Sequence, residues 1–319
     1  MNILLPKTIT PEMLGAATNI PEVDASVGEV AWVSGTNYVV KDRRVHSGYV
    51  YECVKDITSA PQNTYAPSDV RSAGYWLIDK RNPTNRTAPF DKYPFTKARR
   101  TGSVVYQLTL SFVTGIAIYG IEGDTISVTV KDTSGNDLRP TVTSDLWEQA
   151  YGEWDYLFGS LRKVTYFTLK DIPVHPQAVI TITVSRSTPT EQAAIGFISV
   201  GTWKQLLAPV PNATTGAQYG VEATTRDYST YTDYEDGTYE EVEGRKATDI
   251  SLTCVISSDE APAAMELLRQ ILGKAVAIEV SDQSKYSHLA TVGKVTGTVR
   301  SVNWPTAEVD LQIKGNAYD

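Results

Sequence analysis

The stretch from residue 31 to residue 79 begins AWVSGTNYVVKDRRV (31–45), passes through YVYECV (49–54) and ends GYWLID (74–79). It concentrates large aromatic residues in a segment too short to form a large domain: Trp32, Tyr38, Tyr49, Tyr51, Tyr75 and Trp76. Rings at this density either build a small β core or form a stacking surface for a ligand, because both roles need large and rigid side chains. Which role they take largely determines what the protein does.

Short strand-like runs around these rings are separated by SGTN, HSG and the Pro-bearing loop TSAPQNTYAPSD. This alternation of runs and turns predicts a mainly β module with three strands over residues 27–80. Such a module can bury only one small core. We expect Trp32, Tyr38 and Tyr51 in that core.

The composition indicates a folded, acidic protein of two or three domains. The chain has 319 residues, more than a single domain usually has, and 41% of them are hydrophobic. Its formal net charge of −8 disfavours binding to nucleic acid or to an anionic membrane surface, since phosphate contacts need a basic surface. No apolar run approaches the length of a membrane span and no secretory signal is recognisable, so we expect synthesis in a cytoplasm and no membrane insertion.

The remainder of the chain divides into four segments by pattern. Residues 1–26 contain three prolines and few periodic apolar positions, which predicts an N-terminal arm that packs on something larger, such as a neighbouring subunit. Residues 81–102 are polar and Pro-rich, with a basic cluster, and predict a linker or an ion-paired interface. Residues 103–198 alternate apolar and polar positions and predict a β-sandwich of the jelly-roll or galactose-binding-like kind. Residues 199–319 predict a C-terminal β domain with one helix.

One helix is well defined by its sequence, SSDEAPAAMELLRQILG (257–273). We expect its cap at Ser258 or Asp259 and its end at Gly273. Its expected inward residues are Met265, Leu268 and Leu272. A second stretch, LWEQAYGEWDYLFG (146–159), spaces four rings at helical intervals. It predicts either a short helix with one aromatic face or a long loop whose rings plug one end of the sandwich.

An acidic, Tyr-rich segment precedes that helix, and its Asp236-Gly237 pair is a strong hairpin turn. We expect a solvated hairpin over residues 228–243 that connects subunits in an assembly. Its candidate residues are Tyr228, Asp233, Asp236, Gly237 and Glu243. A calcium loop of the EF-hand type does not fit this run, because Tyr234 would occupy a ligand position.

The sequence carries no recognisable catalytic centre. The three histidines, His46, His175 and His288, stand far apart without a metal-spaced partner. Cys53 and Cys254 lie inside strand patterns, which indicates buried thiols rather than a disulfide or a metal site. We therefore expect no enzyme activity, no cofactor and no metal, while a glycan hydrolase with two facing carboxylates stays a third alternative.

The order Trp32, Tyr38, Asp42, Val45, Tyr51, Pro67, Trp76 resembles the small carbohydrate-binding modules of families 5 and 12, which are attached to chitinases. The resemblance covers about one-sixth of the chain and implies a sugar platform, for which Tyr65, Tyr75 and Trp76 are the candidate exposed rings. The sequence departs from the family at Val54–Ile57, where chitin-binding members often place exposed rings. This departure favours a core role for most of the rings.

The succession of segments over most of the chain resembles distal-tail proteins of bacteriophages with long non-contractile tails. The matching pieces are the chitin-binding-like module, PTNRTAPFD (83–91), WDYLF (154–158), IGFISVG (195–201) and a YG…DYS stretch at residues 219–229. The resemblance implies a virion protein of the tail tip that forms a homo-oligomeric ring and joins the tail tube to the hub and fibres. It leaves room for weak binding of a host-surface glycan, and the alternative function is a carbohydrate-binding adhesin.

Overall fold

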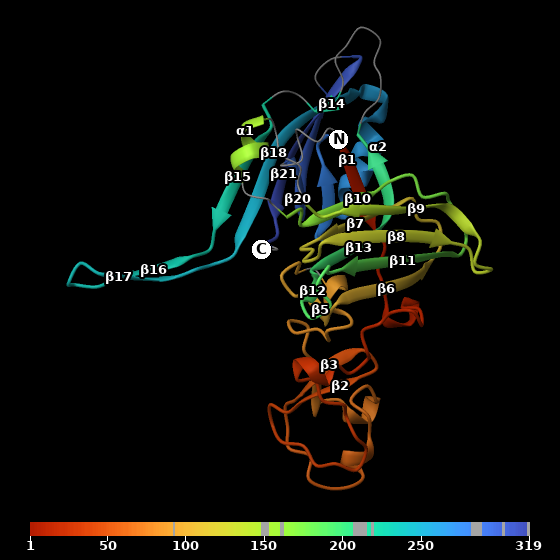
Figure 1. Ribbon diagram of the computed structural model, residues 1–319, viewed down its shortest axis with the longest axis vertical. Coiled ribbons are helices and arrows are strands. Elements are labelled where there is room, and N and C mark those ends of the chain that lie inside the picture. The colour runs from red at the N-terminus through yellow and green to blue at the C-terminus, as the bar shows by residue number, and fades with distance from the viewer. Residues whose placement is uncertain are drawn as a thin grey trace.

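The computed structural model describes residues 1–91, 93–147, 153–159, 163–206, 216–217, 220–281, 289–301 and 304–317. The fold is mainly β, as expected, and its strands pair antiparallel in five sheets. Figure 1 shows an elongated molecule with the aromatic-rich module at one end, two packed β bodies above it and a hairpin that projects sideways.

A sheet of ten strands forms the largest part of the molecule. Its main path runs β10-β7-β13-β1-β19-β20-β21-β18-β14, and β15 also pairs with β18. The strands are β1 (Asn2–Pro6), β7 (Gly115–Tyr119), β10 (Tyr166–Leu169), β13 (Phe197–Gln205), β14 (Gly216–Ala217), β15 (Glu222–Asp227), β18 (Lys246–Ser257), β19 (Val276–Glu279), β20 (Ala290–Ser301) and β21 (Thr306–Gly315). The sheet therefore joins segments that the sequence assigned to two domains, and the boundary expected between residues 198 and 199 falls inside β13.

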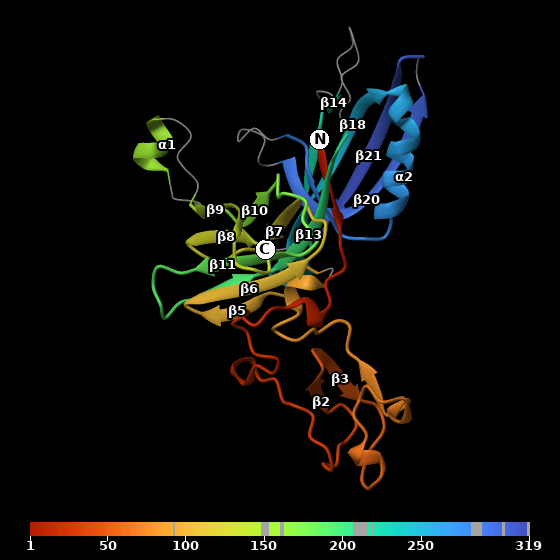
Figure 2. The ribbon, with the colours of Figure 1, turned by 90° about the vertical axis from the view of Figure 1, so that its right-hand side faces the viewer.

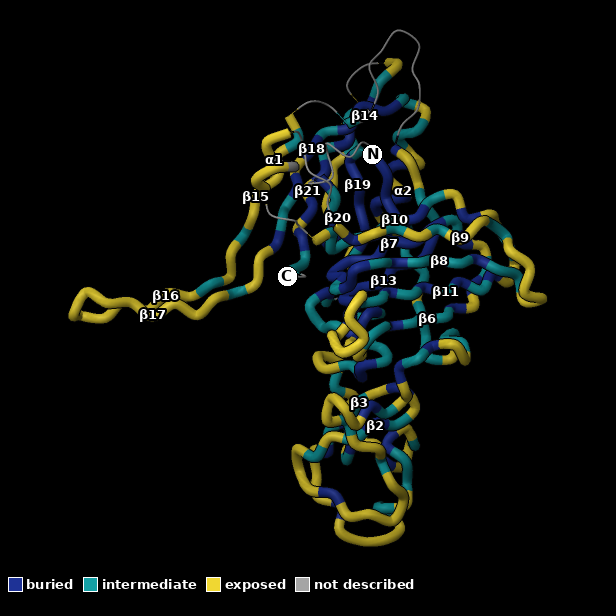
Figure 3. The backbone as a smooth tube through the Cα atoms, in the orientation of Figure 1, coloured by how far each residue is buried: buried dark blue, intermediate teal, exposed yellow. Residues whose placement is uncertain are grey.

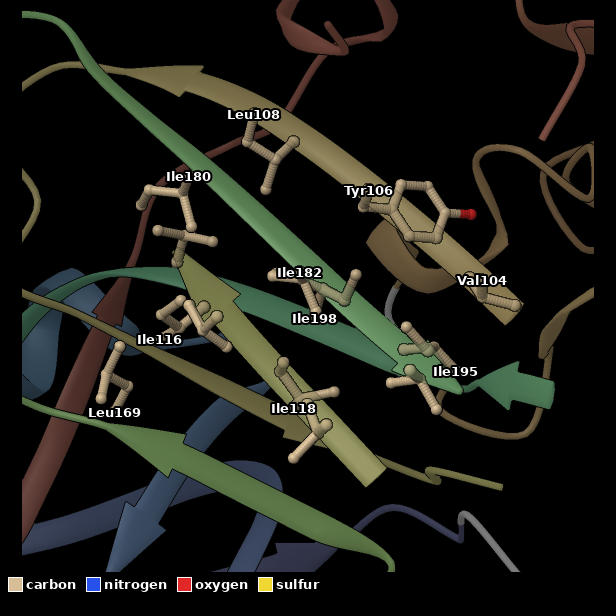
Figure 4. Packing of buried hydrophobic residues seen from close by; sticks show 14 of the residues in the cluster. Val104, Tyr106, Leu108, Ile116, Ile118, Leu169, Ile180, Ile182, Ile195 and Ile198 are labelled. Atoms are coloured by element: carbon tan, nitrogen blue, oxygen red, sulfur yellow. The ribbon is translucent and has the colours of Figure 1, made fainter. Parts of the chain in front are cut away.

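A sheet of four strands packs against one end of the large sheet to form a β-sandwich. Its order is β6-β11-β8-β9, with β6 (Ser103–Leu110), β8 (Thr125–Lys131), β9 (Asp137–Asp145) and β11 (Ala178–Ser185). Burial alternates along β6, β8 and β11, so the predicted half-buried strands are confirmed. Figure 4 shows the core between the sheets, where Tyr106 and Ile182 of the four-stranded sheet lie near Ile118 and Ile198 of the large sheet.

The N-terminal strand β1 lies in the middle of the large sheet. It pairs with β13 along its whole length and with β19 at Asn2 and Ile3. Ile3 packs in the core beneath the C-terminal helix, and Leu4 packs in a small core on the opposite face of the sheet. The prediction of an arm at residues 1–26 is therefore wrong for its first residues, which join the two β bodies.

The predicted C-terminal helix is confirmed as α2 (Ala261–Ile271), which packs on β20 and β1. Its buried residues are Ala264, Leu267, Leu268 and Ile271. Of the expected inward residues only Leu268 is buried, while Met265 and Leu272 are exposed. The expected side-chain cap is also wrong, because residues 258–260 form a turn of 3-10 helix and Glu260 is the cap without a side-chain hydrogen bond. Gly273 follows with φ of +78°, as expected of a helix end.

The aromatic-rich module contains a three-stranded sheet, β2 (Arg43–His46), β3 (Tyr49–Cys53) and β4 (Trp76–Ile78). Tyr38 and Tyr51 are buried in its core, and Trp32 is half-buried against it, as predicted. Cys53 is also buried here, and Cys254 lies in the core under α2, so the prediction of two buried free thiols is confirmed.

The segment 81–102 contains buried residues at 84–85 and 88–89, so this part of it is packed rather than solvated. Asn85 is buried, donates to Asp24 Oδ2 at 2.7 Å, and accepts from the N–H of Arg99 at 2.8 Å. Lys97 forms an ion pair with Glu122 at 2.8 Å, which agrees with the ion-paired interpretation of this segment. Its last strand, β5 (Ala98–Thr101), pairs with β12 (Gln192–Ile195) of the sandwich. The segment thus fixes the module to the body.

Candidate functional site

The expected hairpin over residues 228–243 is present and projects from the body (Figure 1). Its strands are β16 (Thr230–Asp233) and β17 (Tyr239–Val242), which pair only with each other among the described strands. All residues of both strands are exposed, as Figure 3 shows along the projecting backbone. Both strands of the hairpin are therefore accessible along their whole length.

The Asp236-Gly237 pair forms the tip of the hairpin. Gly237 has φ of +82°, a left-handed conformation that costs glycine no steric penalty. The Asp236 carboxylate accepts hydrogen bonds from the hydroxyl and the backbone N–H of Thr238, at 2.6 and 2.9 Å. These two bonds lower the pKa of Asp236, so the tip carries a negative charge at neutral pH.

Ionic and hydrogen-bonded contacts fix the base of the hairpin. Arg226 Nε lies 2.5 Å from Asp249 Oδ2, and Arg226 Nη2 donates to the backbone carbonyl of Gly315 in β21 at 3.1 Å. Asp227 accepts from the hydroxyl of Ser229 at 2.6 Å, and that hydroxyl oxygen accepts from the N–H of Gly244 at 2.9 Å. The network sets the direction in which the chain leaves β15 and returns into β18.

Two tyrosines and two carboxylates share one face of the hairpin. Tyr231 pairs with Glu241 and Asp233 pairs with Tyr239, and because alternate strand residues share a face, all four lie on the same side. The ring centroids of Tyr231 and Tyr239 are 6.4 Å apart, and the two residues are 60% and 65% exposed. A hydrogen bond to Glu241 raises the pKa of the Tyr231 phenol. This face offers aromatic area together with negative charge.

The expected assembly residues occupy different parts of this hairpin. Tyr228 and Glu243 lie at its base, Asp233 lies on the tyrosine face, and Asp236 and Gly237 form the tip. The sequence prediction missed Tyr231 and Tyr239. A two-residue turn at Asp236-Gly237 would have placed them on opposite faces, whereas the observed pairing of Asp233 with Tyr239 shifts the register by one residue and brings both to one face.

A two-stranded hairpin without packing is at best marginally stable in water. None of the hydrophobic clusters formed by the described residues includes a side chain of β16 or β17. A partner that covers the two tyrosines would therefore stabilise the hairpin, and aromatic residues are the commonest energetic centres of protein interfaces.

The candidate sugar-binding rings of the module do not form an open platform. The prediction of Trp76 as an exposed ring is wrong, because it is 5% exposed and its ring meets Tyr38 edge to face at 5.0 Å. Tyr65 is half-buried, and the centroid of its ring lies 4.0 Å from the guanidinium carbon of Arg71. Tyr75 is half-buried beneath the ammonium group of Lys55, at 5.0 Å. The structure does not bring the three rings together as one flat surface.

A second group of exposed rings lies on α1 (Glu153–Phe158), which stands off the sandwich in Figure 2. Trp154 and Phe158 contact each other at 4.5 Å between centroids, and both are mostly exposed. A short helix is therefore confirmed for Glu153–Phe158, where the rings of Trp154 and Phe158 do not plug the sandwich, while Trp147 lies outside the helix in a bridge to Lys163. Tyr151 of the same stretch lies outside the described residues, as do His288 and Tyr219.

The described residues contain no group of three or more His, Cys, Asp or Glu side chains that could hold a metal ion. Helices in the same part of the chain are too short or too polar to cross a membrane. In comparisons with known proteins, no family model, no curated protein and no solved structure matches this chain.

Proposed function

We propose that this chain is a structural protein of a bacteriophage tail tip, a distal-tail or upper-baseplate component that assembles as a ring and joins the tail tube to the hub and fibres. The proposal rests on the order of sequence segments and on one structural observation, the exposed hairpin of β16 and β17. A hairpin that is only marginally stable alone would be stabilised if a neighbouring subunit covered its exposed tyrosine rings.

The body of the molecule has the rigidity that such a role needs. The large sheet runs without interruption from the sandwich to the region under α2. Asn85 links the module to that body, because its backbone N–H donates to Glu29 of the module and its side chain accepts from the N–H of Arg99 in β5. A subunit that joins the tail tube to the hub must hold its two ends at a fixed distance, and a continuous sheet provides that rigidity. The module, of the chitin-binding-like kind by its sequence order, then projects from the far end of the subunit (Figure 1).

The alternative function, a carbohydrate-binding adhesin, needs flat exposed rings. Trp76 is buried in the module core, and a cation covers one face of both Tyr65 and Tyr75. These contacts support the assembly role over the adhesin.

The proposal predicts that the full-length chain self-associates through the tyrosine face of the hairpin. Sedimentation and negative-stain imaging of the purified chain should show closed rings, and Tyr231→Ser with Tyr239→Ser should weaken association by about tenfold or more, because interface aromatics often contribute 2 kcal/mol or more. Val39→Ser with Val70→Ser, two exposed positions on the module, is the matched control. A wild-type chain that stays monomeric up to its solubility limit would contradict the proposal.

A further inference from the structure

A cleft of about 730 Å³ opens beside the base of the hairpin. Its walls come from residues 93–95, from the hairpin base and from the adjoining ends of β20 and β21. The side chains that define its chemistry are Tyr93, Phe95, Tyr228, Arg245, Lys294 and Lys314. The cleft thus combines three rings with three cations in a chain whose net charge is −8.

The three cations are held close together without neutralisation by an ion pair. Lys294 and Lys314 are direct cross-strand partners of β20 and β21, and like charges in that position destabilise a sheet. The guanidinium carbon of Arg245 lies over the Phe95 ring, 3.9 Å from its centroid. Glu243 is the one carboxylate among the described residues that line the cleft. None of the three cations forms a salt bridge within the part of the chain that the structure describes. An anionic occupant would remove their mutual repulsion.

The same chain carries an anionic segment of matching chemistry. The hairpin exposes the carboxylates of Asp233, Glu235, Asp236, Glu240 and Glu241, together with the rings of Tyr231 and Tyr239. The hairpin points away from the body, so its tip is far from the cleft of its own subunit (Figures 1 and 3). A second copy can present its tip there.

We propose that the cleft binds the acidic hairpin of a second copy of this chain. This inference rests on the proposed function and names the receiving site for the hairpin. The Asp233 and Glu241 carboxylates meet the lysines and Arg245, while Tyr231 and Tyr239 cover the rings of the cleft. Because the donor and receiving surfaces are different parts of one chain, a pair joined by one contact still has one free hairpin and one free cleft, and such contacts can close into a ring.

Complementary charge reversal tests the contact with the full-length chain. The cleft variant carries Arg245→Glu, Lys294→Glu and Lys314→Glu, and the hairpin variant carries Asp233→Lys, Glu240→Lys and Glu241→Lys. Each variant alone should associate about tenfold or more weakly, because it places like charges in contact. An equimolar mixture should restore association, since each reversed surface then meets its complement. A chain with Lys80→Glu, Arg81→Glu and Lys274→Glu, all exposed positions away from the cleft, has the same change in charge as the cleft variant and is the control.

The outcomes separate this inference from the proposed function. Rings that form equally well from the cleft variant would overturn the inference and leave the assembly role intact, whereas a monomeric wild type removes both. Variants that are each defective but do not recover on mixing would show that the hairpin and the cleft do not contact each other. Heparin is the probe for an anionic polysaccharide. If the cleft variant still forms rings like the wild type but no longer binds heparin, the cleft is a glycan site and the inference is overturned.

Discussion

Removal of the N-terminal strand should unfold most of the molecule rather than weaken assembly alone. β1 pairs with β13 on one side and with β19 on the other, so among the described strands it joins the two halves of the large sheet. A variant lacking residues 1–6 leaves the facing edges of β13 and β19 open, and open sheet edges invite aggregation.

The magnitude follows from the burial of three side chains. Met1 is 4% exposed, and Ile3 and Leu4 are 0% exposed. Burial of a large aliphatic side chain contributes roughly 1.5–3 kcal/mol, so the three together contribute roughly 5–9 kcal/mol. This amount approaches the whole unfolding free energy of a typical domain, about 5–15 kcal/mol. The single change Ile3→Ala should cost about 2–5 kcal/mol, because a cavity adds to the lost transfer free energy.

Chemical denaturation followed by tryptophan fluorescence measures these differences, with Thr8→Ala, an exposed position just beyond the strand, as the control. The truncated chain should aggregate or unfold without a cooperative transition. If it instead unfolds cooperatively with a midpoint close to that of the wild type, β1 contributes little and the assignment of residues 1–6 to the central sheet is refuted.

Three further predictions concern the interior of the molecule. Trp76→Ala should destabilise the module by about 3–5 kcal/mol in thermal unfolding, as expected for a buried ring, while Tyr49→Ala, at 43% exposure, should cost far less. The pKa of Asp124 is lowered by a hydrogen bond from a backbone N–H and by a neighbouring lysine. Its stabilising effect is therefore present above the unfolded-state pKa and is lost as the pH falls through the lower folded value, so Asp124→Asn should flatten the acid limb of a stability–pH curve. Burial raises the pKa of the Cys254 thiol to about 11, so an alkylating reagent should modify it only after unfolding, as mass spectrometry of native and denatured protein would show.

Sequence patterns predicted the local elements of this fold well, because their signals are local. Alternation at Ile126, Val128 and Val130 marked a strand whose inward residues are fully buried. The helix was also placed correctly, but its buried face is rotated from the expected one and includes Ala264 and Leu267. Spacing alone does not reveal which side of a helix meets the sheet.

The sequence did not predict contacts between residues far apart in the chain, as two places show. β1 is a five-residue run whose partners lie about 200 residues or more along the chain, and nothing in NILLP identifies them. In the module, Tyr75 and Trp76 were both expected to be exposed, yet Trp76 begins β4 and is buried, and Tyr75, just before the strand, packs partly against the same core. Their sequence position did not reveal that both rings contact this core.

The negative charge of the hairpin favours one kind of partner surface over another. A two-stranded sheet has two outer edges, and exposed edges with aromatic side chains tend to pair with copies of themselves. Glu240, Glu241 and Asp233 place negative charge along both strands, so two identical hairpins repel each other when they align edge to edge. The same carboxylates are attracted to a cationic surface, which Arg245 and the Lys294–Lys314 pair provide at the hairpin base. The acidic residues therefore oppose hairpin-to-hairpin association and favour the cleft of another subunit, which is the selectivity that an ordered assembly requires.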